Sequence, residues 1–254
     1  MLEGYGAFIP KSVTGLEDLR TNKAPNVSVV IAADPAIVGL NPSFEGTAAI
    51  GTVLGSLSVR AVHENVGSVD IEQKPRTRRG EPHYDISNQA LGRWLAIALS
   101  NGTSFMDLSL ADQNEITRKG YIFAGTFQGY GGVFLSNSPT CVAIDSDYSY
   151  IEYNAVWNKA AKAVRNALLA RVRSKVETDP TTGFIRSTTI TNWDGIARRA
   201  LEPMVGAGTI SAFDIYINPE QSAVSNKPLL IRIQLVAHGI VHEFDVDLGY
   251  TTQI

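Results

Sequence analysis

The chain has 254 residues, of which 44% are hydrophobic and 19% are charged, values typical of a globular protein with ample apolar material for a core. This length fits one large domain or two smaller ones. The formal net charge of −3 gives no overall attraction to nucleic acid or to an anionic membrane.

Two further properties narrow the class of protein. No stretch of sequence approaches the length of a membrane span, and the first residues lack the basic-then-apolar order of a signal peptide. We therefore expect a soluble product of cytoplasmic synthesis. The single cysteine, Cys141, excludes an intramolecular disulfide, and the apolar run Thr140–Ile144 favours a buried thiol over a nucleophile.

The first part of the chain alternates strand-like and helix-like segments. Val27–Ala32 is a β-branched run that leads to an Asp-Pro pair, the pattern of a buried strand followed by a turn. Gly46–Asn65 is apolar and rich in small residues, which predicts a helix packed closely on that strand. Asn88–Ser100 predicts a second apolar helix. The sequence therefore predicts an α/β (α+β) domain over residues 1–145, with a central sheet flanked by helices.

Shorter elements complete this domain. Ser109 and Asp112 have the spacing of a capping box and predict a short helix that reaches Lys119 and stops at Gly120. Three short strands joined by glycine- and serine-rich turns are then predicted at Tyr121–Phe127, Gly132–Leu135 and Cys141–Ile144.

The rest of the chain has a different order of elements. Ser149 and Glu152 match a second capping box, which opens a basic helix that is predicted to reach about Val176. A second capped helix is predicted over Trp193–Val205. Strands are predicted at Ile210–Ile217, Leu229–Ala237 and Ile240–Leu248. The sequence thus predicts a helix-helix-strand-strand module over residues 146–254.

Signals for catalysis or cofactor binding do not converge. Gly46–Thr52 has the glycine spacing of a phosphate loop but lacks its lysine, and Gly129–Gly132 precedes a strand-like run instead of a helix. His238 and His242 are separated by about 13 Å if they lie in a strand, too far apart to share one zinc ion. No nucleophile elbow or acid–base pair of carboxylates is evident. We therefore expect no enzymatic activity, cofactor or metal.

Positive charge gathers on the predicted basic helix, which has no acidic residue between Glu152 and Glu177. The simplest interpretation is a helix face exposed to solvent. The alternative is a face that binds an acidic protein or, with less support, nucleic acid. If the partner were nucleic acid, the basic run 74–79 would contribute further positive charge to its binding. We interpret the exposed charges as a docking surface, carried by Lys159, Lys162 and Arg165, with Arg198 and Arg199 of the next helix as the alternative carriers.

The C-terminal strands predict self-association. The first of them alternates apolar and mixed side chains, which gives one strongly apolar face, and β-prone sequence continues almost to the last residue. A strand at the end of a chain leaves an edge able to pair with another chain. The predicted subunit–subunit interface comprises Leu229, Ile231, Ile233, Leu235, Val241, Phe244, Val246 and Leu248.

These features together resemble a known family. Residues 140–254 resemble the C-terminal region of contractile-tail sheath proteins, which occur in bacteriophages and in related injection particles. Upstream, Ala48–Asn65 is similar to the large α/β domain of the same family. The resemblance is carried by Ile144–Ile151, Asn154–Arg165, the Trp193–Val205 helix with its Gly206-Ala207-Gly208 stop, Phe213–Asn218 and Leu229–Leu248.

The resemblance implies a structural subunit without catalytic activity. Sheath proteins polymerise as rings or helical strands around an inner tube, lend extended arms to neighbours by strand addition, and contract to drive the tube through a target envelope. The implied partners are other copies of the chain, the tail tube, and the baseplate and tail terminator proteins, with no direct nucleic-acid contact and no membrane insertion. The implied location is a virion tail or contractile particle assembled in the bacterial cytoplasm.

One departure from the family pattern bears on assembly. Full sheaths usually carry an extended N-terminal arm and often outer domains, whereas Ala7–Pro10 leads here almost directly into the core. The alternatives are a trimmed chain and a short family member, and a missing N-terminal region would weaken independent assembly. The competing hypothesis is an α/β enzyme or ligand-binding protein whose site is built from loops that the sequence does not reveal.

Overall fold

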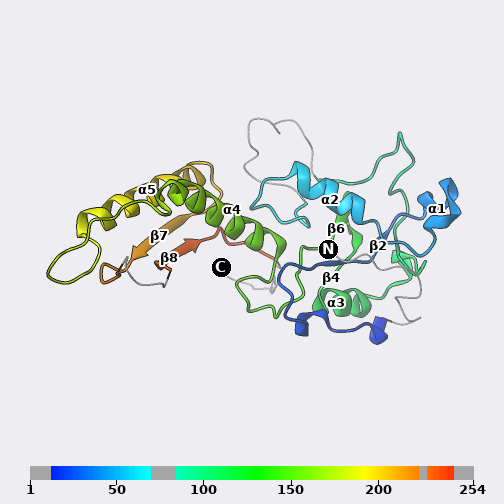
Figure 1. The fold of residues 1–254 in the computed structure, drawn as a ribbon. Helices are drawn as coiled ribbons and strands as arrows, with labels where there is room; N and C mark the ends of the chain where they lie inside the picture. Colours follow the sequence, from blue (N-terminus) through cyan, green and yellow to red (C-terminus); the bar gives the residue numbers. More distant parts are fainter. Residues whose placement is uncertain (1–12, 70–83, 223–227, 243–254) are drawn as a thin grey trace, which may run out of the picture.

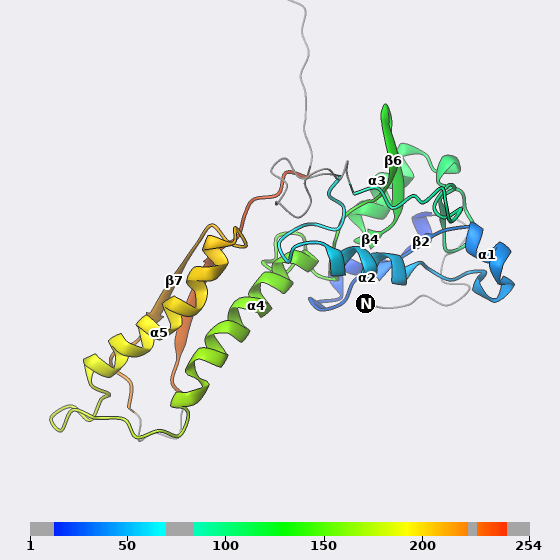
Figure 2. The ribbon, with the colours of Figure 1, turned by 90° about the horizontal axis from the view of Figure 1, so that it is seen from above.

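The computed structural model describes residues 13–69, 84–222 and 228–242 (Figure 1). The described residues before the long helix α4 (Ile151–Leu168) form a mixed body of small sheets and helices, called here the α/β body. Helix α4 and everything after it form an elongated C-terminal module that extends away from this body (Figure 2). The α+β class expected from the sequence is confirmed.

The centre of the α/β body is a strand pair buried on both faces. Strand β1 (Val29–Val30) pairs in parallel with β4 (Tyr121–Ile122). Side chains of alternate residues enter two different hydrophobic clusters, so that Val29 and Tyr121 lie in one cluster and Val30 and Ile122 lie in the other. Burial on both faces explains why Val27–Ala32 is apolar without alternation, and it confirms the predicted core strand.

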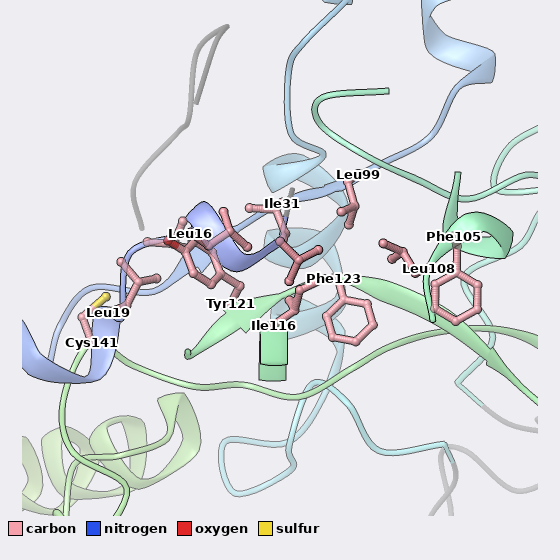
Figure 3. Close-up of a cluster of buried hydrophobic side chains, with 12 residues drawn as sticks. Leu16, Leu19, Ile31, Leu99, Phe105, Leu108, Ile116, Tyr121, Phe123 and Cys141 are labelled. Atoms are coloured by element: carbon pink, nitrogen blue, oxygen red, sulfur yellow. The ribbon is translucent and has the colours of Figure 1, made fainter. Parts of the chain in front are cut away.

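Two helices cover the two faces of this strand pair. Helix α2 (Ile50–Val59) lies within the helix predicted from Gly46–Asn65 and inserts the fully buried Val53 into one cluster. Helix α3 (Leu110–Arg118) inserts Ile116 into the other, where it lies near Tyr121 and Phe123 (Figure 3). The predicted capping box is present, because Ser109 and Asp112 each accept a hydrogen bond from the other's backbone N–H.

The predicted helix over Asn88–Ser100 is wrong. This segment turns instead, with left-handed backbone at Gly92 (φ 60°) and Trp94 (φ 56°). The buried Asp34 carboxylate accepts hydrogen bonds from Arg93 Nε at 2.6 Å and from the Trp94 N–H at 3.1 Å. A polar contact with a residue about sixty positions away thus prevails over the local helical pattern.

The remaining strands form further small sheets. Strand β2 (Ala32–Ala33) pairs antiparallel with β3 (Ala98–Leu99), and β5 (Ala124–Phe127) pairs with β6 (Tyr130–Leu135). The strand predicted at Cys141–Ile144 is wrong, since Cys141 makes only an isolated bridge to Ala24, although its thiol is buried as expected. The shorter helical elements are η1 (Val13–Gly15), η2 (Leu19–Thr21), α1 (Ala36–Leu40), η3 (Pro42–Phe44) and η5 (Phe105–Asp107).

The C-terminal module packs two helices on a hairpin. Helices α4 and α5 (Ser187–Gly206) lie on one face of strands β7 (Ala212–Ile217) and β8 (Ile231–Val236) (Figures 1 and 2). The core of the module includes the buried side chains of Val156, Ala160, Val164, Trp193, Ala197 and Leu201. This cluster is separate from the two clusters of the α/β body.

The boundaries of the two long helices differ from those predicted. Helix α4 ends at Leu168 and continues as η6 (Leu169–Arg171), so it stops short of Val176. The exposed Val172 has extended backbone and Arg173 has a φ of 64°, which ends the helical path. Helix α5 begins at Ser187, six residues before the predicted start at Trp193.

The predicted capping box at Ser149 and Glu152 is also wrong. Tyr150 is the N-cap of α4 and makes no side-chain cap. The Glu152 carboxylate is buried and accepts hydrogen bonds from Asn65 Nδ2 at 2.9 Å and from Ser138 Oγ, both in the α/β body. The residue therefore ties the first turn of α4 to the body instead of closing the end of its own helix.

The last predicted strand falls mostly outside the described residues. Residues 240–242 have no strand structure, and Phe244, Val246 and Leu248 lie beyond the described ranges. Across the ranges that are described, no helix combines the length and the apolar character that crossing a membrane requires.

Candidate assembly interface

The β7–β8 hairpin is the place where the structure gathers the predicted interface residues. Its register runs without a break from Ala212 opposite Val236 to Ile217 opposite Ile231. The side chains of Ile231, Ile233 and Leu235 are half-buried and pack against the module's own core. The residues between them point to the exposed face of the sheet.

The other predicted interface residues flank this strand. Leu229 precedes β8 and is 37% exposed, whereas Val241 follows it and is 67% exposed. Phe244, Val246 and Leu248 belong to the part of the chain that the structure does not describe. The structure thus brings three of the eight residues onto one face and places two more at the ends of the strand.

Hydrogen bonds at the two ends of β8 identify its open edge. The N–H of Leu230 donates to Gln221 Oε1 at 2.7 Å and its C=O accepts from Gln221 Nε2 at 3.0 Å, on the side of β7. The C=O of Val236 accepts from the Ser211 N–H at 2.8 Å, also on that side. Even-numbered residues of β8 therefore turn their main-chain groups toward β7.

Successive residues of a strand turn their main-chain groups to opposite edges. The N–H and C=O groups of three odd-numbered residues of β8 therefore point away from β7, and among the described residues no strand pairs with them. We call this row the open edge. It is formed by Ile231, Ile233 and Leu235.

The outer edge of β7 is, in contrast, occupied by side chains of its own module. Arg198 donates to the C=O of Ile215 at 2.9 Å, and its guanidinium also bonds to Asp194 at 2.8 Å and to Asp214 at 2.9 Å. These bonds raise the pKa of Arg198. The Arg198 guanidinium, helped by the Ile215 N–H, lowers the pKa of Asp214. Charged side chains at an edge block strand addition there.

A groove of about 750 Å³ follows the open edge between β8 and α4. Because consecutive residues of β8 line it, from Ile231 to Leu235, the groove runs along the strand and not across it. Its other wall is α4, which contributes Val156, Ala160 and the half-exposed Trp157. The groove therefore offers main-chain hydrogen-bond groups on one side and apolar side chains on the other.

The predicted docking charges lie on a different side of α4. Lys159, Lys162 and Arg165 are exposed, with Lys162 and Arg165 opposite the buried stripe of the helix and Lys159 at the border of that stripe. Lys159 Nζ donates a hydrogen bond of 3.4 Å to Thr209 Oγ1. On α5, Arg199 is exposed, whereas Arg198 is engaged at the edge of β7 as described above. The sequence did not reveal this role of Arg198, because Asp214 and Ile215 follow in a later element.

The structure offers little for the enzyme hypothesis. A cavity of about 610 Å³ lies beside β2, and Asp34 and Glu45 are the ionisable residues that line it. The Asp34 carboxylate already accepts bonds from the Ala36 N–H, Arg93 and the Trp94 N–H, so it is held in a structural role. Within the described ranges, no three His, Cys, Asp or Glu side chains are grouped as metal ligands.

Comparisons with known proteins agree with this two-part organisation. Residues 3–139 match the model of the DUF2586 N-terminal domain and residues 147–254 match the model of the DUF2586 C-terminal domain. No curated protein shows a significant match to the chain.

Two solved structures match part of the chain, and the first of them shows a similar fold. A chain of the anti-feeding prophage (AFP) baseplate, solved by cryo-EM with 6-fold symmetry, is 14% identical, with a TM-score of 0.51 over 80% of this chain and 49% of that chain. A chain of the contracted PVC sheath complex, from an extracellular contractile injection system, is 11% identical, with a TM-score of 0.43 over 63% and 45%. The present chain thus spans about half the length of these neighbours.

Proposed function

The chain belongs to the DUF2586 family, and we propose that it is a structural subunit of a contractile, phage-tail-like particle, most specifically of its sheath. The fold that it shares with a chain of the AFP baseplate supports the class of particle. The observation that carries the proposal is the open edge of β8 beside an apolar groove, in a hairpin whose opposite edge is blocked. We propose no catalytic role for the protein.

In this proposal, the open edge receives a strand from a neighbouring copy. Ile231, Ile233 and Leu235 each offer one N–H and one C=O, and each bond contributes only about 1 kcal/mol net. Apolar side chains of the incoming strand add to this by filling the groove against Val156 and Trp157. Several weak bonds together give a link that holds while subunits move relative to one another.

The asymmetry of the hairpin sets the geometry of assembly. Since one edge is open and the other is blocked by Arg198, a copy that accepts a strand does not accept a second one at β7. A contact between two different surfaces generates rings if it closes and helical strands if it does not. Both forms are consistent with a sheath.

The two parts of the chain have separate roles in this proposal. We propose that residues 1–145 form the wall of the particle and residues 146–254 form the linking module. The interface then includes Leu229 and Val241 beside the open edge, together with Phe244, Val246 and Leu248 of the terminal segment. The exposed row of Lys159, Lys162, Arg165 and Arg199 would face the inner tube or a neighbouring copy, with baseplate and terminator proteins at the ends of the polymer.

A proline at the open edge tests this function. Ile233→Pro removes an N–H that points away from β7, so the β7–β8 hydrogen bonds are retained while an incoming strand is obstructed. We expect circular dichroism close to that of the wild-type chain, together with loss of the tubes or rings seen by negative-stain electron microscopy. Gln234→Thr, at an exposed side chain of the same strand, is the control and should assemble normally.

Two outcomes would contradict the proposal. One is a folded Ile233→Pro variant that forms the same tubes as the wild type. The other is a wild-type chain that remains a discrete monomer at all concentrations and holds a ligand in a pocket, which would favour the enzyme or ligand-binding alternative.

Deletion of Ile240–Ile254 gives a second test. The described core of the module ends with β8, so the truncated chain should fold and should lose assembly, because the terminal segment is then not present to pair with a neighbour. Global unfolding of the truncated chain would instead assign this segment to the subunit's own core.

A further inference from the structure

Three of the four histidines make ring contacts at the segment that leaves β8, His238 with His63 and His242 with Tyr150. His63 belongs to the α/β body, whereas His238 and His242 belong to residues 237–242, the segment that follows β8. In Figure 2 this segment passes from the end of β8 toward the α/β body. We call the three residues the junction histidines. Sequence spacing could not group them, because the contact joins two distant parts of the chain.

The first contact of the segment is between His238 and His63. Their ring centroids are 6.0 Å apart at an interplanar angle of 53°. Ser211 Oγ lies 3.1 Å from His238 Nδ1 and orients that ring. His63 Nδ1 is enclosed and has no hydrogen-bond partner among the described residues. An imidazole nitrogen in this position gains nothing from a proton, because no acceptor receives it.

The surroundings of His63 lower its pKa on balance, and burial is the largest cause. Burial lowers the pKa of His63, the neighbouring Glu64 carboxylate counteracts this, and His238 and Lys159 of α4 lower the pKa further. The Glu64 carboxylate also accepts a hydrogen bond from Tyr84 Oη at 2.7 Å, which reduces what it offers to His63. Lys159 also disfavours a metal ion between the two rings.

The second contact is between His242 and Tyr150, the N-cap residue of α4. The rings stack with centroids 4.6 Å apart and an interplanar angle of 18°. Burial under this contact lowers the pKa of His242. The Arg20 guanidinium lies 6.0 Å from the centroid of the same Tyr150 ring.

From these contacts we propose that residues 237–242 form a pH-sensitive latch, docked on the junction while His63 and His242 are neutral and released when these two residues take up protons. At neutral pH the His238 ring packs against His63, and the His242 ring packs against Tyr150. A protonated His63 would instead place new positive charge beside Lys159, with Glu64 as the facing carboxylate.

The direction of the pH effect follows from linkage. The docked state holds His63 and His242 at lowered pKa values, whereas a released histidine has its ordinary value near 6.5. Docking is therefore at full strength above about pH 6.5 and weakens as the pH falls through that value. The loss is complete below the docked pKa values. For each pH unit by which docking lowers a histidine pKa, the latch is about tenfold weaker at low pH.

The latch has a consequence for assembly that rests on the proposed function. Residues 237–242 lead into the terminal segment that the proposal assigns to a neighbouring copy. Release at mildly acidic pH would make that segment available for exchange between subunits. The latch itself concerns the single chain and is tested without a particle.

Amide hydrogen exchange of the unassembled full chain tests the latch. We compare about pH 7.5 with about pH 5.5, after correction for the intrinsic effect of pH on exchange. The expected result is a rise of about tenfold or more in the corrected exchange of residues 237–242 at the lower pH. The amides of Arg232 and Gln234, which face β7, should not change.

Variants show whether the histidines are responsible. The double variant His63→Gln/His242→Gln keeps side chains that accept and donate hydrogen bonds but cannot gain charge, so its response to pH should be small. His83→Gln, outside the junction set, is the matched control and should respond like the wild type. An unchanged response in the double variant, or no response in the wild type, would overturn the proposal.

An NMR titration of the wild-type chain keeps the test decisive if the double variant does not fold. The imidazole signals of His63 and His242 should titrate below the ordinary histidine value near 6.5. Titration of both residues at or above that value would overturn the latch. Because no particle is involved, this failure would leave the strand-pairing function untouched.

Discussion

The α/β body and the C-terminal module bury their strands in opposite ways. In the body, β1 and β4 are covered on both faces, by α2 on one side and α3 on the other. In the module, helices cover only one face of β7 and β8, and the open edge of β8 has no partner strand among the described residues. In the body, both faces of the central strand pair are covered by the chain's own helices. In the module, the N–H and C=O groups at the open edge of β8 have no partner strand among the described residues.

The two edges of the module's hairpin sharpen this contrast. An unprotected edge is a hazard for a soluble protein, and proteins commonly block it with charge. Here Arg198 blocks β7, whereas the open edge of β8 is bordered by an apolar groove. Protection of one edge alone supports our proposal that the other edge pairs with a neighbouring copy.

The largest expected effect separates the two cores. Leu201 is fully buried in the module, so Leu201→Ala should lower the free energy of unfolding by about 2–5 kcal/mol. Denaturant unfolding followed by tryptophan fluorescence measures this, with Val53→Ala as the matched change in the body. If the cores are independent, Leu201→Ala should lower the transition of the module and leave that of the body in place. Loss of both transitions together would contradict independent cores.

Glu152 tests the tie between the two regions. Burial raises the pKa of Glu152, so the folded chain holds its proton more tightly than the unfolded chain. Stability should therefore fall as the pH rises above about 4.5 and continue to fall through the raised pKa. The loss is about 1.4 kcal/mol for each pH unit that separates the folded and unfolded pKa values. Glu152→Gln should remove this part of the pH dependence.

Thermal or denaturant unfolding across this pH range measures the effect of Glu152. Glu64→Gln, at a buried carboxylate near the same junction, is the comparison. Equal pH dependence in wild type and Glu152→Gln would mean that the carboxylate is not held as the structure places it.

The exposed charges of α4 should affect assembly far more than folding. Reversal of Lys159, Lys162 and Arg165 to glutamate should change the free energy of unfolding by about 0.5 kcal/mol or less, since the side chains are exposed. Assembly should weaken and become more sensitive to salt, because exposed charges are screened beyond about 10 Å at 0.1 M salt. Normal assembly of the triple variant at low salt would show that these charges are exposed to solvent and do not take part in docking.

The smallest expected effect concerns the blocked edge. Arg198→Ala removes the donor to the Ile215 C=O and should change folding stability little, because its ion pairs are exposed. It should, however, add a weak, concentration-dependent association through β7, detectable by sedimentation velocity. Arg199→Ala is the control on the same helix. If the two variants sediment alike, Arg198 does not prevent strand addition at the outer edge of β7.

Sequence patterns within a single segment correctly predicted the elements that depend only on residues of that segment. The apolar run around Val29 and the Ser109–Asp112 spacing each depend on residues within one segment, and both appear in the structure. The alternation of β8 likewise predicted which side chains share a face. What alternation does not give is the partner of that face, which here is the module's own helices to a large extent.

Long-range polar contacts account for the failed predictions. Asp34 fixes the turn at Trp94, and Asn65 draws Glu152 away from the capping role that its spacing suggested. The asymmetric edges depend on Arg198 reaching a later strand. His63 and His238 come into contact only after both regions have folded. None of these pairs has a fixed spacing in the sequence, so periodicity could not reveal them.

Residue-resolved amide exchange in the unassembled chain and in the assembled particle tests the central claim most directly. We expect fast exchange for Ile231, Ile233 and Leu235 in the unassembled chain and strong protection in the particle. Arg232 and Gln234 should be protected in both, because their N–H groups face β7. Protection of the odd-numbered residues before assembly, or continued fast exchange within the particle, would contradict strand pairing at the open edge.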